Sequence, residues 1–321
     1  MECLYRRDYL AETLLREHPP ELHHPNKQLV SELALAGERS AGTLTVTRWA
    51  AAPLPALTLA ATELVAMPGY FDYAGTTPTN AGVWHVNFAD PELFFAYGSA
   101  LLAQDELQCA EHPALGSIRE ALVHEHLAAL TEQAGAATPV LVAGVERRCT
   151  ISTAPTADRP RGLYGNQFAR AEAATIRAAV EVHRPAPLSN LLAIAAPVGG
   201  GAYTRAQIEY TLVAAYTGFA AAVEESQRRW PGVPVEVRTG FWGCGAFGGH
   251  RELMTMLQLL AARLAGLARL RFYAFDDAGR TDYEAGLAAL TAVLAAGDTS
   301  TNAVVDRIAG LGYVWGQSNG T

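Results

Sequence analysis

The chain has 321 residues, of which 50% are hydrophobic and only 17% are charged. This composition is typical of a globular protein with a sizeable core and excludes an intrinsically disordered chain. The formal net charge of −8 argues against broad nucleic-acid binding, because such binding needs many Lys and Arg contacts to phosphates.

Single residue types exclude several mechanisms. Lys27 is the only lysine, so no P-loop lysine follows the glycines and no Schiff-base lysine exists outside the N-terminal segment. The four cysteines form no C-x-x-C pair, which indicates reduced thiols and no zinc knuckle. The N-terminus lacks the apolar core of a signal peptide, and no stretch is typical of a membrane span. We therefore expect a cytoplasmic protein with no metal, no cofactor and no membrane partner.

The first 65 residues are predicted to be mainly helical. Tyr5 to Glu17 reads as an amphipathic helix, and Pro19, Pro20 and Pro25 break the helical pattern. We expect residues 1–65 to form a helical extension packed on a core of residues 66–321.

Strands and helices are predicted to alternate from residue 83 onward. Strands are expected at 83–89, 138–143, 191–196, 233–238 and 270–275, and helices at 97–109, 117–133, 204–230 and from the glycine-rich loop to 267. The strand at 233–238, the glycine-rich loop, the helix after it and the strand at 270–275 complete a βαβ unit. The alternation predicts an α/β fold with a central sheet flanked by helices.

A glycine-rich run from Thr239 to Gly249 precedes an apolar periodic stretch that predicts a helix. Unpaired N–H groups and the helix dipole favour an anion at such a turn, and glycine lets the backbone approach it closely. The run therefore predicts a phosphate-binding loop. An ordinary tight strand-to-helix connection explains the glycine spacing equally well.

Residues 239–250, with Gln258, Ala261, Ala262 and the segment 272–276, resemble the signature of poly(ADP-ribose) glycohydrolases, a macrodomain family that binds ADP-ribose. A second match, comprising residues 86–89, 104–106 and 112–113, resembles the core strand and Gln-Glu-Glu catalytic segment of that family. The resemblance spans roughly residues 80–280. It implies a macrodomain with a mixed central sheet, and ADP-ribose or an ADP-ribosylated substrate as the partner.

The resemblance also implies catalytic residues. Hydrolysis of a ribosyl C1″ bond passes through an oxocarbenium-like state, which needs a proton for the leaving atom, a water and nearby negative charge. Glu106 matches the family's second glutamate and is expected to be the general acid and base. Asp105 stands for the first glutamate and Asn87 for an aspartate of the preceding strand. From the residues alone, Asp105 and Glu106 also read as a solvated pair on an exposed helix turn.

The substrate-binding residues that the resemblance implies come from the loop and the strand after it. Tyr273 and Phe275 alternate along a predicted strand, so both are expected on one face, where they would enclose adenine; core packing is the alternative for one of them. The full predicted set is Gln104, Phe241, Gly243, Cys244, Gly245, Ala246, Phe247, Gly248, Tyr273 and Phe275.

The chain departs from the family pattern at two loops. Phe94, Phe95 and Ala96 stand where the family has three glycines, and Phe241 stands where it has an asparagine. We therefore expect the cavity to be reshaped and a mono-ADP-ribosyl or small-nucleotide substrate to be preferred to polymer. Two alternatives remain: a non-catalytic ADP-ribose-binding macrodomain, and a hydrolase of a small NAD-derived metabolite. The sequence leaves the linkage and the acceptor open.

Overall fold

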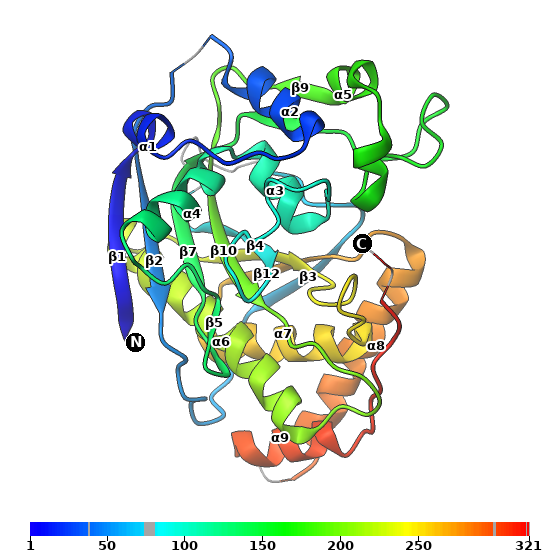
Figure 1. Ribbon diagram of the computed structural model, residues 1–321. Helices are drawn as coiled ribbons and strands as arrows, with labels where there is room; N and C mark the ends of the chain where they lie inside the picture. Colours follow the sequence, from blue (N-terminus) through cyan, green and yellow to red (C-terminus); the bar gives the residue numbers. More distant parts are fainter. Residues whose placement is uncertain (38, 74–80, 298–299, 319, 321) are drawn as a thin grey trace.

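A computed structural model describes residues 1–37, 39–73, 81–297, 300–318 and 320 (Figure 1). The predicted fold class is confirmed, because a mixed central sheet of eight strands is flanked by helices. The strands follow one another across the sheet in the order β1 (Cys3–Leu10), β2 (Thr43–Trp49), β7 (Val140–Glu146), β10 (Leu188–Ala195), β4 (Val83–Ala89), β11 (Glu236–Gly240), β12 (Arg269–Tyr273) and β3 (Glu63–Met67).

The sheet has an antiparallel half and a parallel half. β1, β2, β7 and β10 pair antiparallel, whereas β10, β4, β11, β12 and β3 run parallel. The carboxyl ends of the five parallel strands therefore meet along one edge, which is where ligands bind in open α/β sheets. Two small sheets lie outside it and consist of β5 (Glu132–Gln133) with β6 (Ala136–Ala137) and β8 (Cys149–Ile151) with β9 (Val180–Val182).

Helices cover both faces of the sheet (Figure 1). One face carries α6 (Arg205–Arg229) and α7 (Arg251–Ala265), with α8 (Asp277–Ala295) and α9 (Thr301–Ala309) outside them. The other carries α3 (Gln104–Glu111) against β4 and α4 (Ala114–His124) against β7. The remaining helices are α1 (Ala11–Glu17), α2 (Pro25–Leu35), α5 (Ala173–Ala179) and the short η1 (Gly165–Arg170). Within the described residues, no helix combines the length and apolarity needed to cross a bilayer.

Two elements follow the sequence pattern closely. The predicted strand at 83–89 is β4 with the same bounds, and its side chains are almost entirely buried. The predicted helix at 204–230 is α6, which begins after the N-cap Thr204; the Thr204 hydroxyl accepts the backbone N–H of Gln207. That capping box explains why the start of α6 could be read from the sequence.

The prediction of a mainly helical N-terminal segment is wrong. Cys3–Leu10 and Thr43–Trp49 are paired strands of the central sheet, and Glu63–Met67 forms its opposite edge. Of the residues described in that segment, Ala11–Glu17 and Pro25–Leu35 are the helical ones. Long-range pairing overrides the weak helical preference of the first strand. The domain division at residue 65 stays a prediction, and strands from both sides of it share one sheet.

Two predicted helices have different bounds in the structure. Residues 97–103 form turns, and α3 begins at Gln104. The helix expected to reach Gln133 ends at His124, and Glu132–Gln133 pairs as β5. In both regions the apolar residues of turns and short strands have the same spacing as those of an amphipathic helix.

An ion pair between the half-buried Arg6 and the buried Glu225 attaches the N-terminal strand to α6. The Arg6 guanidinium donates to both oxygens of Glu225 at 2.8 and 2.6 Å, and the Glu225 side chain is 1% exposed. We expect Glu225→Gln to lower the free energy of unfolding by about 2 kcal/mol, because a buried charge-assisted contact is lost. Urea unfolding of the variant and of wild type measures this change in the free energy of unfolding. Glu209→Gln, which removes an exposed partner of Arg205, is the control and should cost well under about 1 kcal/mol; equal losses would contradict the anchoring role.

Candidate functional site

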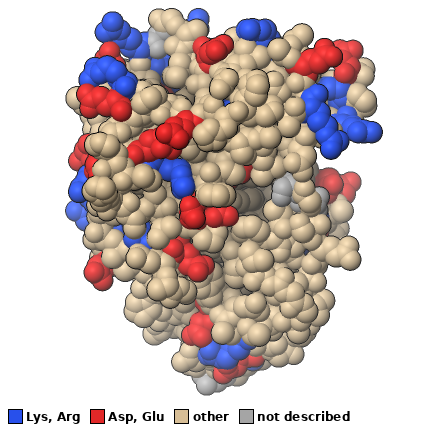
Figure 2. Space-filling view, in the orientation of Figure 1, with Lys and Arg blue, Asp and Glu red and all other residues tan. Residues whose placement is uncertain are grey.

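A cavity of about 560 Å³ opens at the carboxyl ends of the parallel strands. Its size and mixed aromatic and polar lining are typical of small-molecule sites. Strand ends and the loops after them supply Phe88, Gly240, Phe241, Cys244, Gly245, Arg251, Tyr273, Phe275 and Asp276. Other segments supply Tyr70, Phe71, Tyr73, Gln104, Leu107, Gln108, Glu111, Arg147, Thr150, Ile151, Ser152, Thr153, Ala154 and Tyr164. On the face seen in Figure 2, acidic and basic side chains are interspersed around large uncharged areas.

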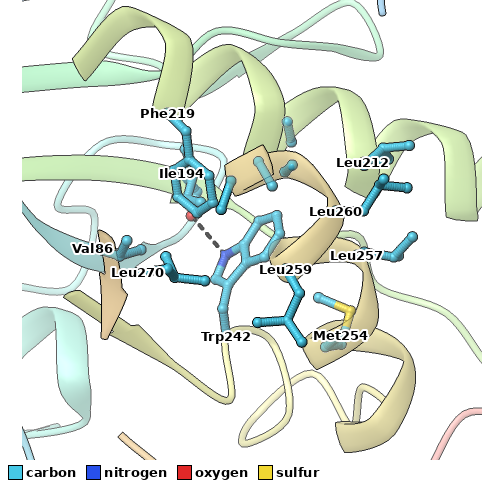
Figure 3. Close-up of a cluster of buried hydrophobic side chains, with 14 of the residues drawn as sticks. Val86, Ile194, Leu212, Phe219, Trp242, Met254, Leu257, Leu259, Leu260 and Leu270 are labelled. Carbon is cyan, nitrogen blue, oxygen red and sulfur yellow. Dashed lines mark hydrogen bonds between the residues drawn. The ribbon is translucent and has the colours of Figure 1, made fainter. Parts of the chain in front are cut away.

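Buried contacts hold the start of the glycine-rich loop where it leaves β11. Trp242 is fully buried among aliphatic side chains, and its indole N–H donates to the carbonyl of Ile194 at 3.0 Å (Figure 3). Gln258 of α7 accepts the Thr239 hydroxyl at 2.5 Å and donates to the carbonyl of Gly240 at 3.0 Å. These contacts hold the start of the loop in place, so that Phe241 reaches the cavity while Trp242 enters the core.

Part of the predicted binding set lines the cavity: Gln104, Phe241, Cys244, Gly245, Tyr273 and Phe275. Gly243, Ala246, Phe247 and Gly248 are not among the described lining residues. Gly243 and Gly248 have positive φ, and a Cβ would meet Ala196 Cβ at 2.5 Å or the Gly316 carbonyl at 2.9 Å. These two glycines therefore serve the turn and its packing, which the glycine spacing alone did not reveal.

An aromatic wall formed by Tyr70, Phe71 and Tyr73 closes the cavity beside β12. The Phe71 ring lies 5.3 Å from that of Tyr273, edge to face. Asp72 anchors this segment, because its carboxylate accepts Arg238 Nη1 at 2.8 Å and the Tyr273 hydroxyl at 2.9 Å. The wall could not be predicted from the sequence, since these residues carry no motif and reach the site only through the fold.

Phe275 differs from its predicted position. β12 ends at Tyr273, and Phe275 has a left-handed φ of 64°. Its ring stacks near that of Phe241 at 6.1 Å, with an interplanar angle of 29°. Both predicted aromatics line the cavity, and it is the backbone turn after the strand that directs Phe275, not strand alternation.

The predicted acid pair lies in the first turn of α3 and is buried, so the alternative of a solvated, exposed pair is wrong. The Glu106 carboxylate accepts the backbone N–H of Ala103 at 3.0 Å. Asp105 accepts the side-chain amide of Asn87 at 2.9 Å. None of Asp105, Glu106 and Asn87 is among the described residues that line the cavity.

Buried amides connect this acid pair to the cavity wall. The amide nitrogen of Asn87 donates to Asp105 and also to Gln108 Oε1, each at 2.9 Å. Gln108 donates in turn to the hydroxyl of Tyr73 at 2.8 Å. Burial raises the pKa of Tyr164, which also lines the cavity, to about 12, and the nearby charge of Glu106 adds to that shift. The pair therefore lies one layer behind the wall.

Lys27 lies beside the acid pair, although it belongs to the N-terminal segment. Its ammonium donates to the carbonyl of Tyr97 at 2.8 Å, and burial lowers its pKa to about 8. Burial raises the pKa of Asp105 to about 7 and raises that of Glu106, while Lys27 opposes both shifts. Proton exchange near neutral pH is therefore chemically accessible at this pair.

Residues 174–282 match the family model described as poly(ADP-ribose) glycohydrolase, macro domain fold. The matched range holds β10, β11, β12 and the glycine-rich loop, which carry the sequence resemblance. This part of the chain is therefore similar to that family. A probable poly(ADP-ribose) glycohydrolase 2 of Arabidopsis thaliana is 43% identical over 60 residues, which are 17% of this chain and 12% of that protein. The match thus covers a small part of that relative's length.

Solved glycohydrolase structures are similar along most of the chain. That of Thermomonospora curvata bound to the inhibitor ADP-HPD has 15% identity and a TM-score of 0.42, covering 88% of this chain and 84% of the other. That of Deinococcus radiodurans in complex with ADP-ribose has 11% identity and a TM-score of 0.40, covering 89% and 95%.

The segment that replaces the three glycines of the glycohydrolase family does not line the described cavity. Phe94 is fully buried in a core cluster with a φ of 54°, a conformation that favours glycine. Phe95 is exposed and lies 5.7 Å from the Arg119 guanidinium. Phe94 and Phe95 therefore do not reshape the cavity by lining it.

The raised pKa of Asp105 predicts that the stability of the protein depends on pH. Its folded pKa of about 7 exceeds the usual value of 3.8, so the folded state binds more protons between these values. Stability should therefore fall as pH rises from about 4 to 7. We expect Asp105→Asn to flatten this part of the curve in urea unfolding at several pH values. An unchanged slope in the variant would contradict a protonated Asp105.

Proposed function

We propose that the chain binds an ADP-ribosyl group in the cavity and hydrolyses its ribosyl C1″ bond, acting on a mono-ADP-ribosylated or related nucleotide substrate. The observation that carries the proposal is the aromatic cavity at the carboxyl ends of the parallel strands, bounded by the loop that belongs to the matched family range. The names of the similar structures, which contain ADP-ribose and ADP-HPD, support this ligand class.

The groups around the glycine-rich loop suit a nucleotide. Phe241 and Phe275 offer ring faces on which adenine can stack. The Arg251 guanidinium lies 4.7 Å from the Phe241 ring centre. Arg251 is also the first residue of α7, and the dipole at the N-terminus of that helix favours negative charge. With Gly245 beside them, these groups would bind the diphosphate.

The proposed chemistry uses Glu106 as acid and base. Its carboxyl group gives a proton to the leaving atom as the C1″ bond breaks, and the bonding electron pair goes to that atom. Water then adds to C1″ and returns a proton to Glu106. Glu106 must first rotate away from the Ala103 N–H, which costs about 1 kcal/mol for one capping contact. Asp105, held by Asn87, keeps the helix turn in place.

A non-catalytic ADP-ribose-binding macrodomain is the second candidate. It is favoured by the contacts that Glu106 and Asp105 make inside the fold, behind the cavity wall. A hydrolase of a small NAD-derived metabolite is the third. All three predict a nucleotide ligand and differ in what is cleaved.

Calorimetry and a cleavage assay separate these candidates. ADP-ribose should bind and stabilise the fold by mass action. Wild type should release ADP-ribose from mono-ADP-ribosylated protein or ADP-ribose 1″-phosphate faster than from poly(ADP-ribose). Binding without cleavage of any substrate would favour the binding module, and cleavage of NAD alone would favour the metabolite hydrolase. Absence of binding at millimolar ADP-ribose would contradict all three.

The anchored aromatic wall gives a further prediction. Asp72→Ala removes the carboxylate shared by Arg238 and Tyr273 and leaves only the backbone carbonyl of residue 72 to accept Arg238, so the segment carrying Tyr70 and Phe71 is held less firmly. We expect the Kd for ADP-ribose to rise about 10-fold, since ordering the wall then costs binding energy. Asp306→Ala, which breaks an exposed pair with Arg205, is the control and should bind as wild type. Equal affinities of all three proteins in calorimetry would show that the anchor is unimportant.

A further inference from the structure

Two carboxylates line the described cavity, Glu111 and Asp276. Asp276 caps α8, where it accepts the backbone N–H of Gly279 at 2.9 Å. Glu111 ends α3, and its side chain is 4% exposed. The catalytic segment predicted from the sequence places its acids one turn or more earlier on the same helix, and those acids lie behind the wall.

Three donors fix the Glu111 carboxylate. Its Oε2 accepts Arg147 Nε at 2.9 Å and Arg147 Nη2 at 2.8 Å, and its Oε1 accepts the backbone N–H of Ile151 at 2.8 Å. Burial raises the pKa of Glu111, and Arg147 opposes that shift. The guanidinium and the backbone N–H are donors only, so their contacts stabilise the negatively charged form of the Glu111 carboxylate.

Arg147 is itself held in place. Its guanidinium lies 4.0 Å from the ring centre of Tyr73, whose hydroxyl accepts the amide of Gln108. Arg147, Tyr73 and Gln108 all line the cavity, so the charge of Glu111 belongs to a rigid part of the wall. Rigid, pre-oriented charge is what stabilises a transition state most effectively.

We propose that Glu111 is the fixed negative charge that faces the reacting ribosyl group and stabilises its oxocarbenium-like transition state. This inference rests on the proposed hydrolysis. The two glutamates differ in their contacts. Glu106 accepts one backbone N–H and is proposed to exchange the proton, whereas three donors hold the Glu111 carboxylate, which forms no bond to the substrate. Both Glu111 and Arg147 lie outside residues 174–282, so the matched part of the family model does not contain this charge pair.

The test compares Glu111→Gln with wild type on the substrate that wild type cleaves fastest. We expect kcat to fall about 10²-fold, the usual effect of losing one stabilising group, while KM and the Kd for ADP-ribose change little. Glu225→Gln is the matched control, because it also removes a buried carboxylate paired with an arginine, far along the chain on α6. It should lose stability and keep kcat.

A second variant covers the case in which Glu111→Gln fails to fold. Glu111→Gln with Arg147→Gln removes both charges and leaves neither unpaired; it should fold and show the same loss of kcat. The pH profile gives a readout that a merely structural role would not produce: the limb assigned to Glu106 should persist in the Glu111 variants and disappear in Glu106→Gln.

Wild-type kcat in a folded Glu111 variant would overturn the inference and leave the proposed hydrolysis intact. If wild type binds ADP-ribose but cleaves none of the substrates, the hydrolysis and the inference are rejected together. A fall in the affinity for ADP-ribose with unchanged kcat would also overturn the inference, because Glu111 would then act in binding alone.

Discussion

Glu106→Gln is expected to slow glycosidic cleavage by about 10²-fold or more while ADP-ribose binding is retained, which is the usual scale for losing a positioned general acid. The amide still accepts the Ala103 N–H, so the first turn of α3 keeps its contact. It cannot give the leaving atom a proton or take one from water at neutral pH. Single-turnover cleavage measures the rate, and calorimetry measures binding.

Glu12→Gln is the matched control for this variant. Glu12 also lies in the first turn of a helix, but it is exposed on α1 and paired with Arg39. Its replacement should leave cleavage unchanged. A Glu106→Gln protein with wild-type activity would show that the carboxylate stays behind the wall and that another group transfers the proton.

Gly245→Glu is expected to weaken ADP-ribose binding by at least about 10²-fold. Gly245 and Arg251 both line the cavity, and the diphosphate is proposed to bind to them. A glutamate there adds bulk and a like charge, and two like charges about 4 Å apart repel by about 4 kcal/mol near a protein surface. Calorimetry with ADP-ribose measures the change.

Gly200→Glu is the control for this second variant. Gly200 is exposed, and a Cβ there meets no atom within 4 Å. Gly248 is unsuitable, because its positive φ and its contact with the Gly316 carbonyl would couple binding to folding. Undiminished binding by Gly245→Glu would place the diphosphate elsewhere.

Some elements could be predicted because the residues that determine them are neighbours in the sequence. The capping box marks the start of α6, and the apolar run has the same bounds as β4. The glycine-rich run predicted a strand-to-helix loop at the cavity, and the structure adds the reason for its shape, which is the burial of Trp242 and the contacts of Gln258.

Long-range contacts explain what could not be predicted. β1 is a strand because it pairs with β2, more than thirty residues later in the chain. Lys27 reads as an isolated lysine in the sequence, yet α2 brings it to the acid pair of α3. Glu111 lies between the matched residues 104–106 and 112–113 without being part of either, and only the fold brings Arg147 to it. A resemblance identifies a catalytic segment, whereas only the fold shows which of its side chains reach the cavity.

A crystal structure of the chain soaked with ADP-ribose tests the central claim most directly. The account predicts that the ligand fills the cavity, with adenine against Phe241 and Phe275, the diphosphate at Gly245 and Arg251, and the ribose C1″ toward Glu106 and Glu111. ADP-ribose bound outside this cavity, or an empty cavity at millimolar ligand, would contradict it.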